Sequence, residues 1–101
     1  MDDSHQIHIP ASFLALYMEP GQLRPRAGRA EISARYELCE DLAQHLVDYA
    51  RGQQSDLGIT EEDVLERLER GLEAPASGLA PPESRWIVRR LAELAGWPPA
   101  R

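Results

Sequence analysis

The sequence predicts a small all-α protein: a bundle of about four helices arranged around one long helix near residues 29–51. Three observations support this fold class. Apolar residues recur at alternating spacings of three and four over several stretches, which is the pattern of a buried helix face. Proline and glycine stand between those stretches. The alternation typical of a strand is confined to residues 6–9, which we expect to form an extended lead-in.

Length and composition predict one helical domain over residues 1–101. The chain has 101 residues, 43% of them hydrophobic, with both charge signs interspersed. We expect residues 1–6 to be loose and residues 22–28 and 74–81 to be connectors. No apolar run is long enough to cross a membrane and the N-terminus is acidic, unlike a signal peptide, so we expect a cytoplasmic protein. The single cysteine agrees with a reducing compartment.

The chain contains no lysine, because all eleven basic residues are arginine. A phosphate-binding loop uses a lysine to reach the nucleotide phosphates, and Schiff-base chemistry needs a lysine amine. The sequence therefore excludes a self-contained ATPase of the P-loop type, and it excludes catalysis that depends on a lysine side chain.

The first helix is expected to begin at Pro10, because proline fits the first turn of a helix, where its missing N–H is not needed. Ile9 can pack against that turn, and Phe13 and Tyr17 give the short helix an aromatic face. The segment Glu19-Pro20-Gly21 should end it, since proline and glycine favour a turn.

The long helix is expected to carry small and apolar side chains along one face. That face comprises Ile32, Tyr36, Cys39, Ala43, Leu46 and Ala50. A second row, Leu38, Leu42 and Tyr49, lies about 100° around the helix axis, so we expect this helix to contact neighbours on two sides. We expect it to end near Gly52, with a loop over residues 53–58.

The last two helices have clear start signals. Thr60 precedes three acidic residues, so its hydroxyl can cap the helix and the acids favour the positive helix end. The buried stripe of this third helix is Val64, Leu65, Leu68 and Leu72. Prolines at positions 81 and 82 open the fourth helix, and Gly96 with Pro98 ends it. Its inward face is Ile87, Val88, Leu91, Leu94 and Ala95.

No group of residues has the spacing of a reactive site. His5 and His8 could ligate a metal ion, but no third ligand is positioned beside them, so we expect solvated histidines. Cys39 and His45 lie about 120° apart around the helix and about 9 Å apart along it, so they cannot pair as nucleophile and base. Cys39 is expected to be an inert core thiol. We therefore expect no catalytic residue, no metal, no cofactor and no enzymatic activity.

Charge is unevenly distributed along the chain. Residues 24–35 hold four arginines against one glutamate, a net charge of +3, whereas residues 37–73 hold eleven acids against three arginines, a net charge of −8. The basic segment could meet phosphates, an acidic protein or solvent, and the acidic rows could be solvated or attract a basic partner. The linker over residues 74–80 is too long for a helix-turn-helix motif and the chain is acidic overall, so we do not expect DNA binding.

Trp86, Arg89 and Arg90 leave two interpretations open. Tryptophan and arginine are enriched at interface hot spots, and Trp86 can stack with Arg90 four residues later. Alternatively, Trp86 and Trp97 fill a core that is short of aromatic residues, while the arginines pair with acids on a neighbouring helix.

Four segments, IPASFLALY, RYELCEDLAQ, GITEEDVL and ESRWIVRRLAELAGW, together resemble a family of short uncharacterised bacterial proteins, and the resemblance covers nearly the whole chain. Some members carry the label of an ATPase with chaperone activity. Because this chain lacks the lysine that such chemistry needs, the resemblance implies at most chaperone-associated partners and no catalytic residues.

These observations predict a non-catalytic interaction or adaptor module that binds a protein partner or forms a homodimer. The alternative is a nucleic-acid-associated regulator that uses the segment Arg24–Arg35. The candidate partner-binding residues are Arg24, Arg26, Arg29, Arg35, Trp86, Arg89 and Arg90.

Overall fold

The computed structural model describes residues 8–98, and that range contains α-helices and 3₁₀ turns but no strand. The all-α prediction is confirmed. The expected loose residues 1–6 and the candidate ligand His5 lie outside the described range. In chain order the elements are α1 (Ala11–Leu14), η2 (Ala15–Tyr17), α2 (Arg29–Leu57), α3 (Glu61–Leu72), η3 (Pro75–Ser77) and α4 (Pro81–Ala95).

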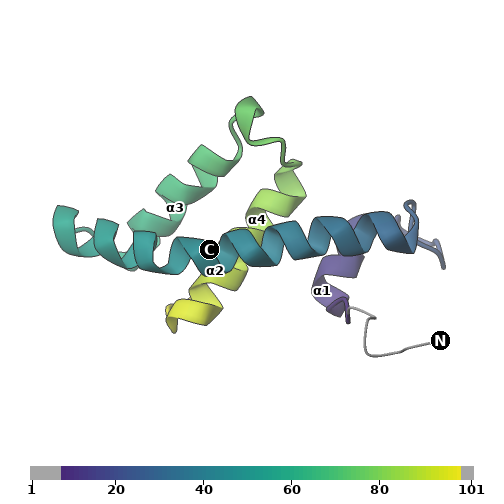
Figure 1. Ribbon diagram of the computed structural model, residues 1–101, viewed down its shortest axis with the longest axis horizontal. Helices are drawn as coiled ribbons and strands as arrows, with labels where there is room; N and C mark the ends of the chain where they lie inside the picture. The colour runs from purple at the N-terminus through teal and green to yellow at the C-terminus, as the bar shows by residue number, and fades with distance from the viewer. Residues whose placement is uncertain (1–7, 99–101) are drawn as a thin grey trace. The chain divides into compact units, whose positions relative to one another are not determined.

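The chain divides into two compact units, Met1–Leu38 and Cys39–Arg101. The division falls within α2, which Figure 1 shows as one uninterrupted helix. A single domain over the whole chain stays a prediction. In the described range, no helix combines the length and the apolarity that crossing a membrane requires.

The first unit has an aromatic core. Phe13 is fully buried, and its ring centroid lies 5.7 Å from that of Tyr17 and 5.6 Å from that of Tyr36. Pro10 caps α1, with its carbonyl accepting from the N–H groups of Phe13 and Leu14 at 3.0 Å, and the chain then tightens into η2. The short first helix with an aromatic face is therefore present. Its proline stands one position before the first turn instead of within it.

The long helix α2 extends six residues past its predicted end at residue 51. It continues through Gly52 and ends before Gly58, whose φ of 63° is in the left-handed region and whose N–H donates to the carbonyl of Gln54 at 2.9 Å. Glycine within a helix costs only about 1 kcal/mol relative to alanine. Gly52 does not have a positive φ and residues 52–54 are half-buried, so the helix continues through them. The predicted loop over residues 53–58 is therefore wrong, and Gly58 is the glycine that ends the helix.

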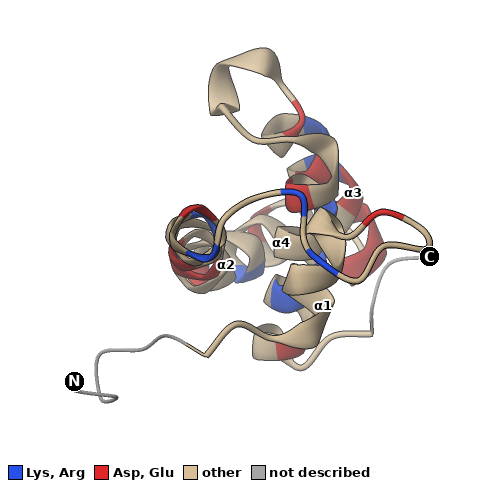
Figure 2. Ribbon diagram, turned by 90° about the vertical axis from the view of Figure 1, so that its right-hand side faces the viewer, with Lys and Arg blue, Asp and Glu red and all other residues tan. Residues whose placement is uncertain are grey.

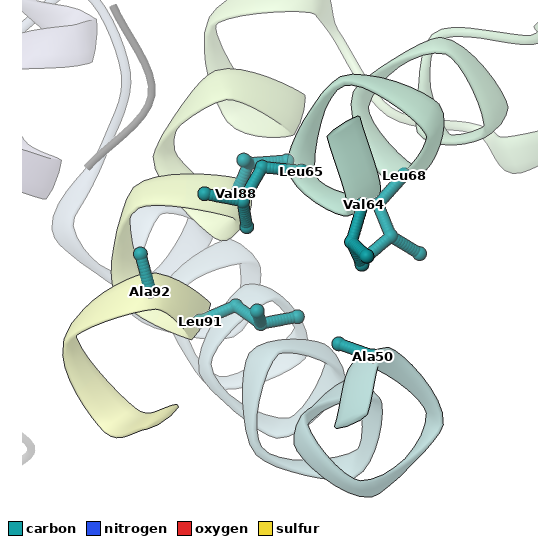
Figure 3. Packing of buried hydrophobic residues seen from close by; sticks show 7 residues of the cluster. All are labelled: Ala50, Val64, Leu65, Leu68, Val88, Leu91 and Ala92. Atoms are coloured by element: carbon teal, nitrogen blue, oxygen red, sulfur yellow. The ribbon is translucent and has the colours of Figure 1, made fainter. Parts of the chain in front are cut away.

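The core of the second unit is built from all three of its helices (Figure 3). α2 contributes Ala50, a small residue that allows close approach, and α3 and α4 contribute larger aliphatic side chains. The buried cluster is Ala50, Val64, Leu65, Leu68, Val88, Leu91 and Ala92. Leu46, Val47, Ile59, Leu72 and Trp97 pack against it and are partly buried. The predicted stripe of the third helix forms the core, with Leu72 only partly buried. In the fourth helix Ile87, Val88 and Leu91 are buried as predicted, whereas Leu94 and Ala95 are only half-buried and Ala92, which was not predicted, is buried instead.

Local hydrogen bonds fix the ends of α3 and α4. The Thr60 hydroxyl accepts from the N–H of Asp63 at 3.1 Å, as predicted for a capping threonine. At the other end of α3, the Leu72 carbonyl accepts hydroxyl hydrogen bonds from Ser77 at 2.6 Å and Ser84 at 3.1 Å. These bonds hold the turn at η3 that joins the two helices in Figure 1. Gly96, with φ of 75°, ends α4.

Candidate interaction surfaces

The second apolar row of α2 is not covered as the sequence led us to expect. Leu38 keeps 42% of its surface exposed and Tyr49 keeps 54%, while Leu42 is half-buried. Four of the six residues of the first row, Ile32, Cys39, Ala43 and Ala50, are buried, and Tyr36 and Leu46 are half-buried. The helix is therefore buried on one side, and the expectation of contacts on two sides is wrong for the described residues. An apolar row on the longest helix is left facing solvent.

Within the second unit, four residues of α2 on and beside this row have the spacing of a hole in helix packing. Leu42, His45, Leu46 and Tyr49 occupy positions i, i+3, i+4 and i+7, which is the arrangement that receives a knob side chain in helix packing. Leu42 and Tyr49 lie about 10 Å apart along the helix axis, so a single aliphatic side chain fits between them. Leu46, one of the four residues, is partly buried and packs against the core of the second unit. We call these four residues the α2 hole.

Acidic side chains border the α2 hole. Asp41 and Asp48 each precede an apolar residue of the hole by one position, so both lie along the same edge. Both are exposed. His45 lies between the acidic and apolar rows, with its Nδ1 2.7 Å from the carbonyl oxygen of Asp41. The α2 hole is thus a partly exposed apolar patch with an acidic edge.

The connector between η2 and α2 has a defined structure in the first unit. The Gln22 N–H donates to the carbonyl of Glu19 at 3.0 Å across a turn in which Gly21 has φ of 78°. Arg26 anchors the other side. Its backbone N–H donates to the Tyr17 carbonyl at 2.8 Å, and its guanidinium lies 5.2 Å from the centre of the Tyr17 ring and donates to the Leu16 carbonyl at 3.2 Å.

Leu23 and Arg24 lie between these two anchors, and we call them the connector tip. Leu23 is 96% exposed, far more than any other large hydrophobic residue in the described range. Arg24 is exposed as well. Figure 2 shows basic residues in this connector and acidic residues along α2 and α3. The connector tip is therefore an apolar projection with a positive charge beside it.

The guanidinium of Arg90 binds two glutamates within the second unit. Its Nε and Nη2 donate to the two carboxylate oxygens of Glu40 at 2.9 and 3.0 Å, and its Nη1 donates to Glu93 at 3.1 Å. The hydrogen bond from Arg90 lowers the pKa of Glu40, against the opposing effect of burial, and the hydrogen bond to Glu40 raises the pKa of Arg90. Such a bidentate pair is a strong link between helices, here between α2 and α4.

The other candidate residues are placed differently. Trp86 is only 8% exposed and Trp97 packs against the core, which matches the interpretation that the tryptophans fill the core. Arg89 is exposed, as is Arg29, while Arg35 is half-buried. Arg29 and Arg35 each make an interaction within the protein, and Arg26 is the anchor of the connector. A partner-binding role for the exposed arginines stays a prediction.

No protein-family model, curated protein or solved structure matches the chain. The resemblance to short bacterial proteins therefore stays a prediction. In the described range no cluster of histidine, cysteine and acidic side chains has the makings of a metal site. A depression of about 420 Å³ on α3 is lined by Ile59, Asp63, Glu66, Arg67 and Arg70, so its two acids and two arginines balance in charge.

Sequence reasoning missed three residues that matter to this picture. The sequence pattern does not single out Leu23, because a leucine in a loop belongs to no periodic apolar face. Glu40 enters the sequence analysis only through the net charge of residues 37–73, although its carboxylate is the partner of Arg90. Glu83 is 4% exposed and accepts from the N–H of Ala80 at 2.9 Å, capping α4. Glutamate at the third position of a helix is a recognisable capping signal, because its side chain can accept from the N–H of the residue before the helix. The sequence could therefore have marked Glu83.

Proposed function

We propose that this chain is a helical protein–protein interaction module that acts by binding, and that it works in the cytoplasm. The observation that carries the proposal is the α2 hole, whose aromatic residue Tyr49 is 54% exposed on a helix that is otherwise buried along its neighbouring face. Isolated exposed apolar residues are ordinary on soluble proteins. Exposed apolar residues at the spacing of a helix-packing hole, with acidic residues beside them, are a more specific feature, because this is the pattern of a helix-packing surface.

Three further features support a binding role. Tyrosine is enriched among residues that dominate interface energetics, since it buries a large area at small cost in side-chain entropy. The acidic rim formed by Asp41 and Asp48 supplies charge selectivity without lying in the apolar centre, which is the usual anatomy of an interface. The hole also lies on a helix that the bidentate Glu40–Arg90 pair and the buried cluster hold in place. A partner therefore meets a surface that needs little ordering.

Site-specific photo-cross-linking in the cells that make the protein tests this proposal. Tyr49 is replaced by a photoreactive phenylalanine derivative of similar shape, and Glu62, an exposed residue at the start of α3, carries the same group as a matched control. We expect a discrete cross-linked protein from position 49 and none from position 62. Absence of an adduct at position 49, or the same adducts at both positions, would refute an interaction through the α2 hole.

A further inference from the structure

The connector tip and the α2 hole have the spacing and exposure of a knob and a hole in helix packing. Leu23, 96% exposed, projects as an aliphatic knob, and Leu42, His45, Leu46 and Tyr49 have the i, i+3, i+4 and i+7 spacing that receives such a side chain. The knob is also held ready, because the turn at Gly21 and the anchor at Arg26 fix the connector on both sides. A preorganised loop loses less conformational entropy when it docks than a flexible one does.

The two surfaces are complementary in charge as well. Arg24 is exposed and follows the knob directly, whereas the exposed Asp41 and Asp48 border the hole. Two α2 holes brought face to face would place four aspartates together and repel each other. Charge therefore favours contact between unlike surfaces over contact between like ones.

We propose that this chain binds a second copy of itself, with Leu23 of one copy inserted into the α2 hole of the other and Arg24 beside Asp41 and Asp48. This inference rests on the proposed function, because it names the partner that occupies the same hole. The contact is heterologous, since each copy uses a different surface. Every copy also carries both surfaces, so association can extend beyond a pair.

The expected affinity is low. A knob, a hole and a charged rim bury far less than the roughly 1,600 Å² of a standard stable interface. The contact should therefore be transient and depend on concentration, with a dissociation constant on the order of 100 µM. Added salt should weaken it, because the Arg24 charge and the aspartates meet near the protein surface.

Sedimentation velocity of the full chain over about 10 µM to 1 mM measures this association directly. We expect the average mass of the natural protein to rise with concentration and to fall when salt is added. Leu23→Ser removes the knob and Tyr49→Ser removes one wall of the hole, so each should weaken self-association at least tenfold. Leu57→Ser is the matched control, because Leu57 is 48% exposed on the same helix but outside the hole, and it should associate like the natural protein.

Mixing the two defective variants gives the decisive result. The Leu23→Ser protein keeps an intact hole and the Tyr49→Ser protein keeps an intact knob, so an equimolar mixture should form one-to-one pairs that cannot extend. All substituted residues are exposed, so each variant should fold, and circular dichroism checks this. A natural protein that stays monomeric at 1 mM, a Leu23→Ser variant that associates normally, or a mixture of folded variants that stays monomeric would each overturn the proposal.

The failure of this inference and the failure of the proposed function are distinguishable. Photo-cross-linking at position 49 should give an adduct with twice the mass of the chain, joined to the connector tip. An adduct with a different protein, together with a monomeric chain in the centrifuge, would overturn self-association and leave the binding function standing. No adduct and no self-association would remove both.

Discussion

Alanine substitutions at Gly52 and Gly58 should change the stability of the protein in opposite directions. Gly52 lies inside α2 and does not have a positive φ, whereas Gly58 ends the helix with φ of 63°. An added Cβ would have nothing within 4 Å at either position. The two substitutions therefore differ in backbone conformation and not in crowding, which makes them a matched pair.

The magnitudes follow from the backbone at each site. Gly52→Ala should stabilise the protein by about 0.5–1 kcal/mol, because alanine loses less backbone entropy in a helix than glycine does. Gly58→Ala should destabilise it by about 1–2 kcal/mol, because an L-residue in the left-handed region brings its Cβ close to the following carbonyl. For a domain of this size, 1 kcal/mol corresponds to a shift in melting temperature of about 4–8 °C.

Thermal unfolding followed by circular dichroism measures both variants against the natural protein. We expect Gly52→Ala to melt several degrees higher and Gly58→Ala several degrees lower. If α2 ended near Gly52, as the sequence alone suggests, Gly52→Ala would be destabilising and Gly58→Ala nearly neutral. That reversed pattern would refute the helix boundary and the account of what ends the helix.

Three further substitutions test the second unit. Leu91→Ala removes a fully buried side chain from the core and should cost about 2–5 kcal/mol of unfolding free energy, measured by urea titration. Thr60→Ala removes the cap of α3 and should cost about 1 kcal/mol in the same assay. Glu40→Gln should cost about 1–2 kcal/mol at pH 7, because it weakens the bidentate pair with Arg90. Since the folded-state pKa of Glu40 is lowered from about 4.5, this difference should persist above that pH and be lost as the pH falls through the folded-state value.

Each of these substitutions has an internal comparison. Glu93→Gln removes the other carboxylate that faces Arg90, but Glu93 is 69% exposed, so its effect should be small at every pH. If Glu40→Gln and Glu93→Gln lowered the free energy of unfolding equally, the importance of the bidentate pair would be contradicted. A Leu91→Ala variant that unfolds like the natural protein would show that the buried cluster does not hold the second unit together. A Thr60→Ser variant should retain the cap.

The helix starts and the core could be read from the sequence because their signals are local. Thr60 with its acids and Pro81 mark helix starts that depend on nearby backbone groups. The end of α2 could not be read, because Gly52 and Gly58 are both glycines and the sequence does not show which of them takes the left-handed conformation that ends the helix. The exposure of Tyr49 could not be read either. The apolar spacing of Leu38, Leu42 and Tyr49 is the same whether another helix or solvent covers this row.

Net charge along a sequence also overstates the charge that a surface can offer to a partner. The +3 segment includes Arg26, whose guanidinium is held by the Leu16 carbonyl and the Tyr17 ring inside its own unit. Arg51 likewise donates to the carbonyl of Ala95 at 3.1 Å, and Arg90 is paired with Glu40. A guanidinium has five N–H donors, so arginine can bind several backbone and carboxylate groups at once.

The charge that matters for binding is therefore local rather than summed. Arg24 is exposed beside the most exposed leucine of the described range, and Asp41 and Asp48 are exposed beside the α2 hole. Nucleic-acid binding needs several phosphate contacts made by one continuous basic surface. A single arginine next to an apolar knob suits a small protein surface with an acidic rim instead. The arrangement of a few residues around Leu23 and Tyr49, and not the overall acidity of the chain, is what favours a protein partner.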